Sequence, residues 1–448
     1  MPESGPRVRG ATVDSRTDVV VIGAGPAGLA AAHHLAAGGL AVTVLEAAPR
    51  VGGRMATERV DGFLLDRLGR PLGTAWAGPP GAPDAPAVPL RAFAPGVTVH
   101  SDGRRHRIGA PRPPRGARGA RGALTAVRAL AGAPLTPLPP RPAALDQARL
   151  GAALGRLAAT PGDRLLARPE RTAREAYTSP LARLLLSALL YDPALLSSSR
   201  SADLALRAFA RGRLCVPEGG AAALPGLLAA TLPAGCAVHT DVWVTDASID
   251  RVTTKEHGEI ACRALVVATG ARAAAGLLPG LRVPEFQSVT VFHHSAPVAP
   301  ATGTALLLDA DRGGPVAHTA VMSAVDPARA PGGRTLVSST VLGPPPADAA
   351  IRAHLARMYG VPTHDWDLLA VHHDPEAVPR TRPPHDPRRP VRLLAGLYVC
   401  GDHRDSATVE GALHSGRRAA RAVLADLGRG AHRTPGAAAS GPPRESAA

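Results

Sequence analysis

The sequence predicts an α/β protein in which a Rossmann-like parallel sheet is joined to an α+β body containing an antiparallel sheet. Residues 18–46 give the order strand, glycine-rich turn, helix and strand, which is the order of a βαβ unit. Residues 283–342 contain runs that alternate in the manner of antiparallel strands. At 448 residues the chain has room for two or three domains.

Composition excludes several classes of protein. Apolar residues make up 45% of the chain and charged residues 19%, which is ample for buried cores and excludes a wholly disordered chain. The four cysteines are scattered without a C-x-x-C pair, which argues against a zinc module or a disulfide scaffold and indicates a reducing compartment. They are Cys215, Cys236, Cys262 and Cys400.

The net charge of +15 comes mostly from one segment. Residues 103–149 hold ten arginines against the single Asp146, and they contain no aromatic side chain on which a base could stack. We therefore expect no nucleic-acid partner. The longest apolar stretch, residues 181–196, is interrupted by charge and proline, so we predict no membrane span. The apolar run at residues 19–25 is too short for the core of a signal peptide, so we expect no export and a cytoplasmic protein.

The first 46 residues place the elements of the nucleotide-binding unit. The first 16 residues are polar and are expected to be a flexible lead. A strand begins at Asp18, because a run of β-branched residues without polar alternation is typical of a parallel sheet covered on both faces. Strong helix formers over residues 27–37 end at Gly38-Gly39, and a second strand follows over residues 41–46.

The rest of the chain alternates between insertions and further α/β elements. Residues 78–142 are rich in proline, glycine and arginine and predict an insertion of long loops with a short strand near residues 96–100. Beyond it we expect helices over 144–158, 172–190, 347–359 and 409–427, strands over 237–250, 259–270 and 396–401, proline-rich loops from about 360 to 390, and a flexible tail over 429–448.

The turn after the first strand carries three glycines, each with a separate physical reason. They give a tight turn, a close approach of backbone to a pyrophosphate, and close packing of helix on strand, while the helix directs its free N–H groups at the phosphates. Glu46 ends the second strand, where a carboxylate accepts hydrogen bonds from ribose hydroxyls and favours FAD or NAD over NADP. The motif is Gly23-Ala24-Gly25-Pro26-Ala27-Gly28.

The next residues carry a resemblance to a known family. Residues 46–54, EAAPRVGGR, resemble the segment after the second strand in FAD-dependent oxidoreductases of the flavin amine oxidase and phytoene desaturase superfamily. The resemblance implies FAD, a FAD-binding fold of the glutathione reductase type, and Gly53 and Arg54 near the pyrophosphate and ribitol. A guanidinium offers fixed donors to an anionic diphosphate, which agrees with that assignment.

A second motif near the C-terminus is similar to the closing motif of the same superfamily. It runs from Gly401-Asp402 to Gly411-Ala412, and the resemblance implies contacts of the first pair with diphosphate and ribitol and of the second with the flavin. The helix that begins at Val409 offers a positive N-terminus where reduced flavin gathers negative charge. In the middle of the chain, Val244 stands where relatives contact adenine through the backbone.

The sequence also departs from these relatives. Flavin amine oxidases commonly place a lysine near the flavin, yet the only lysine, Lys255, lies in a predicted surface hairpin. Asp66 and Gly69 are spaced more widely than in relatives, and His403 and Arg404 fit either a role at the flavin edge or a plain loop. Adjacent histidines point in different directions, so no metal site is expected. No catalytic side chain is assigned.

These patterns predict a discontinuous FAD-binding domain over residues 17–77, 205–280 and 390–428 and a substrate domain over 78–204 and 281–389. The predicted function is removal of hydride from a C–H bond of an apolar small molecule, as in phytoene desaturase-like enzymes. Two alternatives stay open: an amine or porphyrinogen-type oxidase that uses oxygen, and a flavin-binding protein without redox turnover. The arginine-rich segment suggests a hypothesis of peripheral membrane contact; the oligomeric state stays open.

Overall fold

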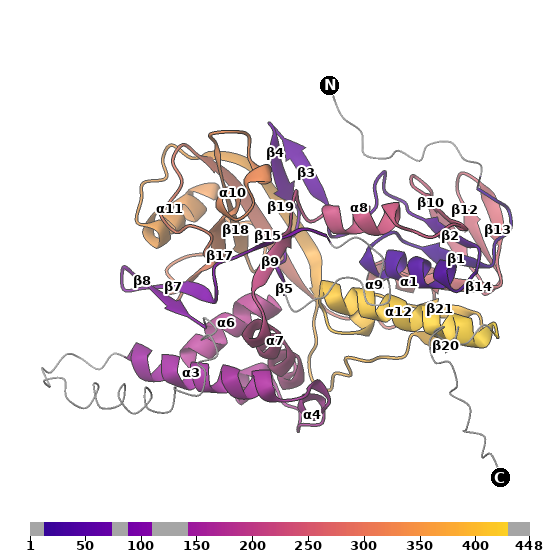
Figure 1. The fold of residues 1–448 in the computed structure, drawn as a ribbon, viewed down its shortest axis with the longest axis horizontal. Helices are drawn as coiled ribbons and strands as arrows, with labels where there is room; N and C mark the ends of the chain where they lie inside the picture. The colour runs from indigo at the N-terminus through magenta and orange to yellow at the C-terminus, as the bar shows by residue number, and fades with distance from the viewer. Residues whose placement is uncertain (1–12, 74–87, 110–141, 429–448) are drawn as a thin grey trace, which may run out of the picture.

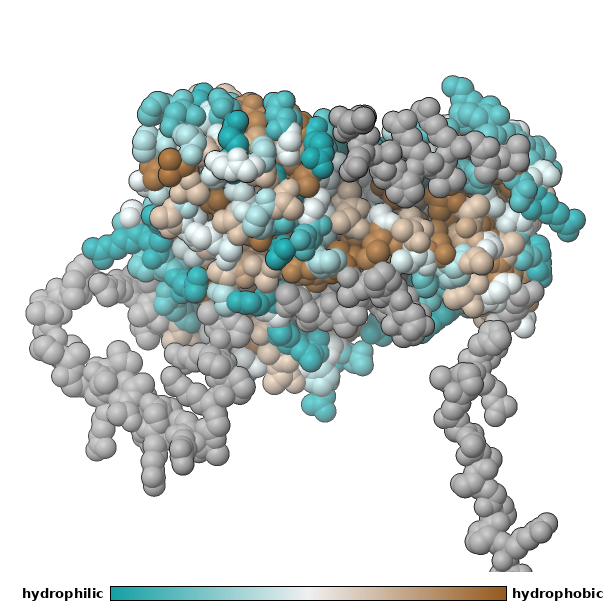
Figure 2. Space-filling model, turned by 45° about the horizontal axis from the view of Figure 1, so that its top comes forward, coloured by the Kyte–Doolittle hydropathy of each residue, from teal (hydrophilic) through white to brown (hydrophobic). Residues whose placement is uncertain are grey.

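The computed structural model describes residues 13–73, 88–109 and 142–428. Two bodies lie side by side in Figure 1, one around a parallel sheet and the other around an antiparallel sheet. Most of the predicted arginine-rich segment, residues 1–12 of the predicted lead and the predicted tail over 429–448 lie outside the described residues. Arg16, at the end of the predicted lead, instead forms a β-bridge with Ala261. On the face that Figure 2 shows, apolar side chains gather toward the middle of the molecule.

The first body is built on a six-stranded sheet with the order β10-β2-β1-β14-β21-β20. All neighbours in it are parallel except the last pair. Its strands are β1 (Val19–Ile22), β2 (Val42–Leu45), β10 (Cys236–His239), β14 (Ala264–Val267), β20 (Arg392–Leu394) and β21 (Leu397–Val399).

Both faces of this sheet are covered, which is why β1 is apolar throughout. Val19 and Val21 pack among α1 (Pro26–Ala37), α8 (Ala223–Ala230) and α12 (Val409–Asp426). Val20 and Ile22 pack on the other side, against a three-stranded antiparallel sheet and α9. That side consists of β11 (Val244–Ala247), β12 (Arg251–Thr254), β13 (Gly258–Ala261) and α9 (Ala271–Leu277).

The second body is built on a seven-stranded sheet with the order β19-β15-β18-β17-β16-β7-β8. Its pairs are antiparallel except that β16 and β7 run parallel. The strands are β7 (Val97–Ser101), β8 (Arg104–Ile108), β15 (Phe286–Ala296), β16 (Leu307–Asp309), β17 (Val316–Val321), β18 (Thr335–Val341) and β19 (Asp367–Pro379).

Helices cover both faces of the second sheet as well. On one face of the sheet, Ile351 and Leu355 of α11 (Asp348–Tyr359) are buried in an apolar core. The core on the opposite face includes Leu150, Leu185 and Leu308. The remaining helices are α3 (Pro142–Ala159), α4 (Gly162–Leu166), α5 (Ala173–Ala176), α6 (Pro180–Leu190), α7 (Ser199–Arg211), α10 (Met322–Val325) and the 3-10 turns η1 (Pro327–Arg329) and η2 (Asp402–Arg404).

Two small sheets join the bodies. The hairpin of β3 (Thr57–Val60) and β4 (Phe63–Asp66) stands between them in Figure 1. A three-stranded sheet combines β5 (Leu72–Gly73), β6 (Leu90–Ala92) and β9 (Leu214–Pro217). Segments far apart in the sequence are thus held together by short strands.

The structure corrects four expectations about elements. The strand β19 lies where proline-rich loops were expected; it is the edge of its sheet, where proline needs no partner for a missing N–H. The helix expected over 172–190 is interrupted, because Ser179 caps a new helix with Pro180 at its first position. The strand expected over 237–250 divides into β10 and β11, and the strand expected over 259–270 divides into β13 and β14, because in each case the two parts belong to different sheets.

Within the described residues, no helix is both long and apolar enough to span a bilayer.

Candidate functional site

A cavity of about 770 Å³ lies at the carboxyl ends of the parallel strands. Gly23 follows β1, Glu46 follows β2 and Gly401 follows β21, and all three line it. In open α/β sheets ligands bind at this edge, where the loops after neighbouring strands converge.

The glycine motif after β1 has the geometry of a phosphate cradle. Gly23 has a φ of +103°, and a Cβ there would lie 3.1 Å from the backbone of Ala268, which directly follows the neighbouring strand β14. A Cβ on Gly28 would lie only 1.9 Å from the carbonyl oxygen of Gly23. Gly25 lines the cavity at the start of α1, where no side chain caps the helix. The first N–H groups of α1 are thus available to an anionic ligand, which fits a dinucleotide diphosphate.

Glu46 is held in place by two backbone amides. One carboxylate oxygen accepts from the N–H of Ala24 at 2.7 Å and the other from the N–H of Ala48 at 2.9 Å. The remaining lone pairs of the carboxylate can accept hydrogen bonds from hydroxyl groups of a ligand in the cavity. Trp243 and Val244 line the same cavity, on the loop and strand that follow β10.

Arg54 and Asp402 form an ion pair across the cavity wall, with 2.6 Å between a guanidinium nitrogen and a carboxylate oxygen. Arg54 also donates to the carbonyl of Ala377 at 2.8 Å. Burial alone would raise the pKa of Asp402, but the charge and hydrogen bond of Arg54 outweigh burial and lower it. The pair therefore keeps the carboxylate ionised and orients both side chains.

The start of α12 forms another part of the cavity wall. Thr408 caps the helix by accepting from the N–H of Gly411 at 3.0 Å. A Cβ on Gly411 would lie 2.0 Å from the carbonyl oxygen of Ser406, so this glycine is needed for the turn into the helix. Ala412 and Val409 face the cavity.

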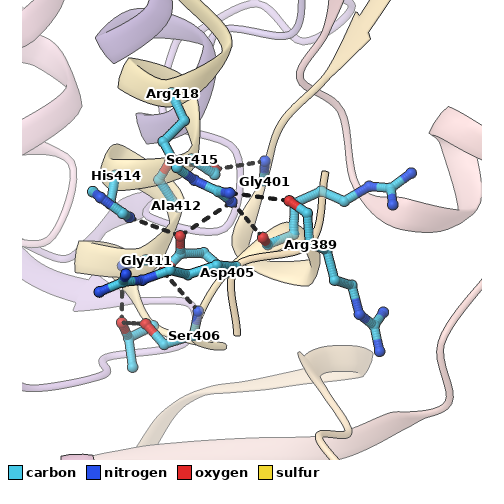
Figure 3. Close-up of polar contacts among 12 residues, drawn as sticks. Arg389, Gly401, Asp405, Ser406, Gly411, Ala412, His414, Ser415 and Arg418 are labelled. Atoms are coloured by element: carbon cyan, nitrogen blue, oxygen red, sulfur yellow. Dashed lines mark hydrogen bonds and ion pairs between the residues drawn. The ribbon is translucent and has the colours of Figure 1, made fainter. Parts of the chain in front are cut away.

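The loop between Asp402 and α12 is fixed by one arginine and one aspartate. Figure 3 shows Arg418 reaching from α12 to the carbonyl oxygen of Arg389, to which it donates at 3.0 Å. Arg418 also donates to the carbonyl oxygen of Arg404 at 2.6 Å. Asp405 accepts from His414 at 2.7 Å and pairs with Arg418 at 3.3 Å. These contacts fix the loop beside the cavity, and neither Asp405 nor Arg418 lines the cavity itself.

The predicted site residues converge from three separate stretches of sequence. Three of them lie behind the cavity wall, where they shape the backbone: Ala24, Gly28 and Gly411. The others line the cavity: Gly23, Gly25, Pro26, Ala27, Glu46, Gly53, Arg54, Val244, Gly401, Asp402 and Ala412. His403 and Arg404 are absent from the lining residues, and His403 is only 6% exposed.

A second cavity, of about 430 Å³, adjoins the first. Arg70, Thr408 and Val409 line both cavities. Its walls are mostly apolar and come from α6, α7 and the segments near residues 378 and 407. Its charged lining residues among those described are Arg70, Arg213 and Glu410.

Sequence reasoning did not identify this second cavity. Helix α7 was not predicted, although its sequence has apolar residues at helical spacing. Glu410 stands inside the motif that runs from Gly401 to Ala412, and Arg70 directly follows the segment from Asp66 to Gly69, whose spacing departs from that of relatives. Both residues therefore lie in or beside segments that the sequence had already singled out.

One cluster could in principle hold a cation. Ligand atoms of His100, Asp309 and Asp311 lie within 4.8 Å of one another. The carboxylate of Asp309 already accepts from His354 at 2.9 Å and from the N–H of Gly313 at 2.7 Å. The cluster is therefore a satisfied hydrogen-bond network that joins β7, β16 and α11.

Comparison with protein families gives a match over residues 26–424 to the family described as flavin containing amine oxidoreductase. Putrescine oxidase of Kocuria rosea is 48% identical over 73 residues, which are 16% of this chain and 14% of that enzyme. The chain therefore aligns with only a small part of this curated relative.

Solved structures share the fold over nearly the whole chain. An oxidoreductase from Methanosarcina mazei has a TM-score of 0.65 and 17% identity, over 90% of this chain and 99% of that one. A putative protoporphyrinogen oxidase from Exiguobacterium has a TM-score of 0.65 and 17% identity, over 93% of this chain and all of that one. At such identities the likeness concerns the fold alone.

Proposed function

We propose a function from the premise that this chain belongs to the family of flavin-containing amine oxidoreductases. It is accordingly an FAD-dependent oxidoreductase. The proposal concerns the residues that hold FAD, the position of the substrate and the bond that is oxidised.

We propose that FAD occupies the larger cavity. The residues that would hold its adenosine diphosphate part are those of the glycine motif, Glu46 and Val244, and those that would hold the ribitol and flavin are Gly53, Arg54, Gly401, Asp402, Gly411 and Ala412. An uncapped helix start, a fixed carboxylate, an ion pair and the N-terminus of α12, all at one cavity, support this assignment.

The domain division is part of the proposal. We infer that residues 17–77, 205–280 and 390–428 form an FAD-binding domain of the glutathione reductase type and that 78–204 and 281–389 form the substrate domain. The parallel sheet, covered on one face by a three-stranded antiparallel sheet, supports the first assignment.

The second cavity is the proposed substrate site. Bound FAD supplies an acceptor for a hydride, so the protein needs to position a C–H bond at the junction of the two cavities and to keep water out. Apolar residues of α6 and α7, such as Leu189, Leu204 and Phe209, form the water-excluding walls. The shared lining of the two cavities is the observation that carries this proposal.

The dimensions of this cavity favour a compact apolar substrate over a long polyene. Its volume of about 430 Å³ lies in the lower half of the usual range for small-molecule sites. Lys255 lies at the turn between β12 and β13, and it lines neither of the two cavities. We therefore assign no side chain as an acid or base.

An amine is the second candidate substrate, and Glu410 favours it. Its carboxylate lines the second cavity near the start of α12, where one oxygen accepts from the N–H of Gly73 at 3.3 Å. A fixed carboxylate in a cavity with mostly apolar walls attracts an alkylammonium group, whereas a neutral hydrocarbon gains nothing from it; the other charged residues of the lining are Arg70 and Arg213.

Anaerobic reduction of the bound flavin tests both candidates. The holoenzyme is mixed with matched neutral and amine substrates, and bleaching of the flavin is followed before and after air is admitted. We expect a compact apolar compound to bleach it. Protein that is reduced by dithionite but by no member of a broad substrate panel would contradict the proposal.

The Glu410→Gln variant separates the two candidates. If amines are the substrates, loss of the carboxylate should raise KM for amines by about tenfold, the effect of one charge-assisted hydrogen bond, and leave neutral substrates unchanged. Ser201→Ala, a change in the same cavity without loss of charge, is the matched control.

A further inference from the structure

The paired ends of β15 and β19 stand between the two cavities. Phe286 and Ala377 line the larger cavity, whereas the residues that directly follow them, Gln287 and Val378, line the second. Gln287 and Val378 are also partners in the antiparallel ladder of the two strands. Because successive side chains of a strand point to opposite faces, this pair of strands presents one row of side chains to each cavity.

Gln287 carries a buried amide on the wall of the second cavity. The residue is only 9% exposed, and no described residue makes a hydrogen bond to its side-chain amide. That amide offers an acceptor oxygen and a donor NH2 group. Buried polar groups in folded proteins are nearly always paired, so an unpaired amide on a cavity wall marks a position where a ligand completes the pairing.

Thr381 adds a second uncharged polar group to the same wall. It is buried and lines the second cavity, and its hydroxyl makes no hydrogen bond to a described residue. The backbone brings its segment beside that of Gln287, because the N–H of Arg380 donates to the carbonyl oxygen of Glu285 at 2.8 Å. This part of the wall therefore offers neutral hydrogen-bonding groups within a mostly apolar lining.

We propose that Gln287 is a substrate-specificity residue that binds an uncharged amide, so that the compound oxidised in the second cavity carries a carboxamide or lactam group on an apolar frame. The inference rests on the proposed substrate site. The N–H of such a ligand donates to the side-chain oxygen of Gln287 while its carbonyl oxygen accepts from the NH2 group, so one planar group satisfies both halves of the glutamine. A ketone would accept from the NH2 group and leave the side-chain oxygen unpaired.

A matched pair of probes tests the proposal on the FAD-loaded protein without requiring turnover. Benzamide and acetophenone share a ring and a carbonyl group and differ only in NH2 against CH3, and the dissociation constant of each is measured by calorimetric titration. We expect benzamide to bind about fivefold more tightly, which is the effect of one added hydrogen bond between neutral groups. Equal dissociation constants, or tighter binding of acetophenone, would overturn the proposal.

Variants assign the preference to one side chain. Gln287→Met removes the amide and keeps an unbranched side chain of similar length, so the two probes should then bind within about twofold of each other. Gln147→Met is the matched control, because this glutamine lies on α3 and lines neither cavity, and it should keep the full preference. A preference for benzamide that persists in Gln287→Met refutes the assignment.

Two further measurements keep the outcome decisive. If Gln287→Met does not retain FAD, Gln287→Asn takes its place: it withdraws the amide by one methylene and should reduce the preference to less than about twofold, and an unchanged preference would count against a direct contact. Failure of all substrates to bleach the flavin, with benzamide preferred and the preference lost in Gln287→Met, would contradict the proposed function and leave this inference intact. Bleaching by apolar compounds, with equal binding of the two probes, would do the reverse.

Discussion

At the scale of single residues, buried charged side chains join the body with the parallel sheet to the body with the antiparallel sheet. Arg329 is 1% exposed and donates to Asp66 at 2.5 Å, to Asp326 at 3.2 Å and to the carbonyl of Pro217 at 3.1 Å. Asp66 also accepts from Thr57 at 2.7 Å and from the N–H of Ala221 at 2.8 Å. The irregular segment after Asp66 is therefore fixed by an ion pair with a residue far along the chain.

We expect Arg329→Met to lower the free energy of unfolding by about 3–5 kcal/mol, because it leaves two carboxylates buried without their cation. Urea unfolding of the FAD-loaded protein measures the change. The matched control is Arg388→Met, which removes an exposed pair with Asp163 at 3.2 Å and should cost no more than about 1 kcal/mol. Equal effects of the two substitutions would show that the buried cluster has no special role.

At the scale of elements, the contact of α1 with α12 brings the two ends of the chain together. Gly416 makes this contact, because a Cβ there would lie 2.1 Å from the carbonyl oxygen of Ala27. The first turn of α1 and the first turns of α12 both line the larger cavity. Close packing of two helices thus sets the distance between the two halves of the proposed FAD site.

Gly416→Ala should force the helices apart, with a loss of about 1–3 kcal/mol in stability and weaker retention of FAD. Thermal unfolding and the FAD-to-protein absorbance ratio measure the two effects. Gly155→Ala in α3 is the control, since a Cβ there meets no atom within 4 Å and alanine should stabilise the exposed helix by about 0.5–1 kcal/mol. An unchanged FAD ratio in Gly416→Ala would argue against the role of this contact.

At the scale of the whole molecule, buried histidines make stability depend on pH. Burial lowers the pKa of four histidines to about 4: His293, His318, His385 and His403. In the unfolded chain a histidine titrates near 6.5. Between these values the unfolded state binds protons that the folded state excludes, so stability is complete above about pH 6.5 and decreases toward pH 4.

His318→Phe should flatten this dependence, because His318 is 5% exposed and its lowered pKa has burial as its only cause. The loss of stability between pH 7 and pH 5 should be about 2 kcal/mol smaller than in the unaltered protein. Urea unfolding at the two pH values with saturating FAD provides the measurement. His106→Phe, on the exposed strand β8, should leave the loss unchanged; a parallel decrease there would refute the explanation.

The sequence by itself determined the elements whose pattern is local. A run of β-branched residues, three glycines and Glu46 predicted β1, α1 and β2, because these signals act within a few turns of chain. The same local reasoning predicted that residues near Gly401 belong with those near Gly23, through resemblance to a family whose match was then found over residues 26–424.

Only the tertiary structure decided what depends on distant partners. The edge position of β19 depends on a strand about 70 to 90 residues away, and the buried cluster around Arg329 and the second cavity with Arg70 and Glu410 arise from segments hundreds of residues apart. No local pattern distinguishes a buried arginine from an exposed one, because burial is set by what other segments place around it. The physical reason is that packing and charge pairing act through space, whereas the patterns of a sequence act along the chain.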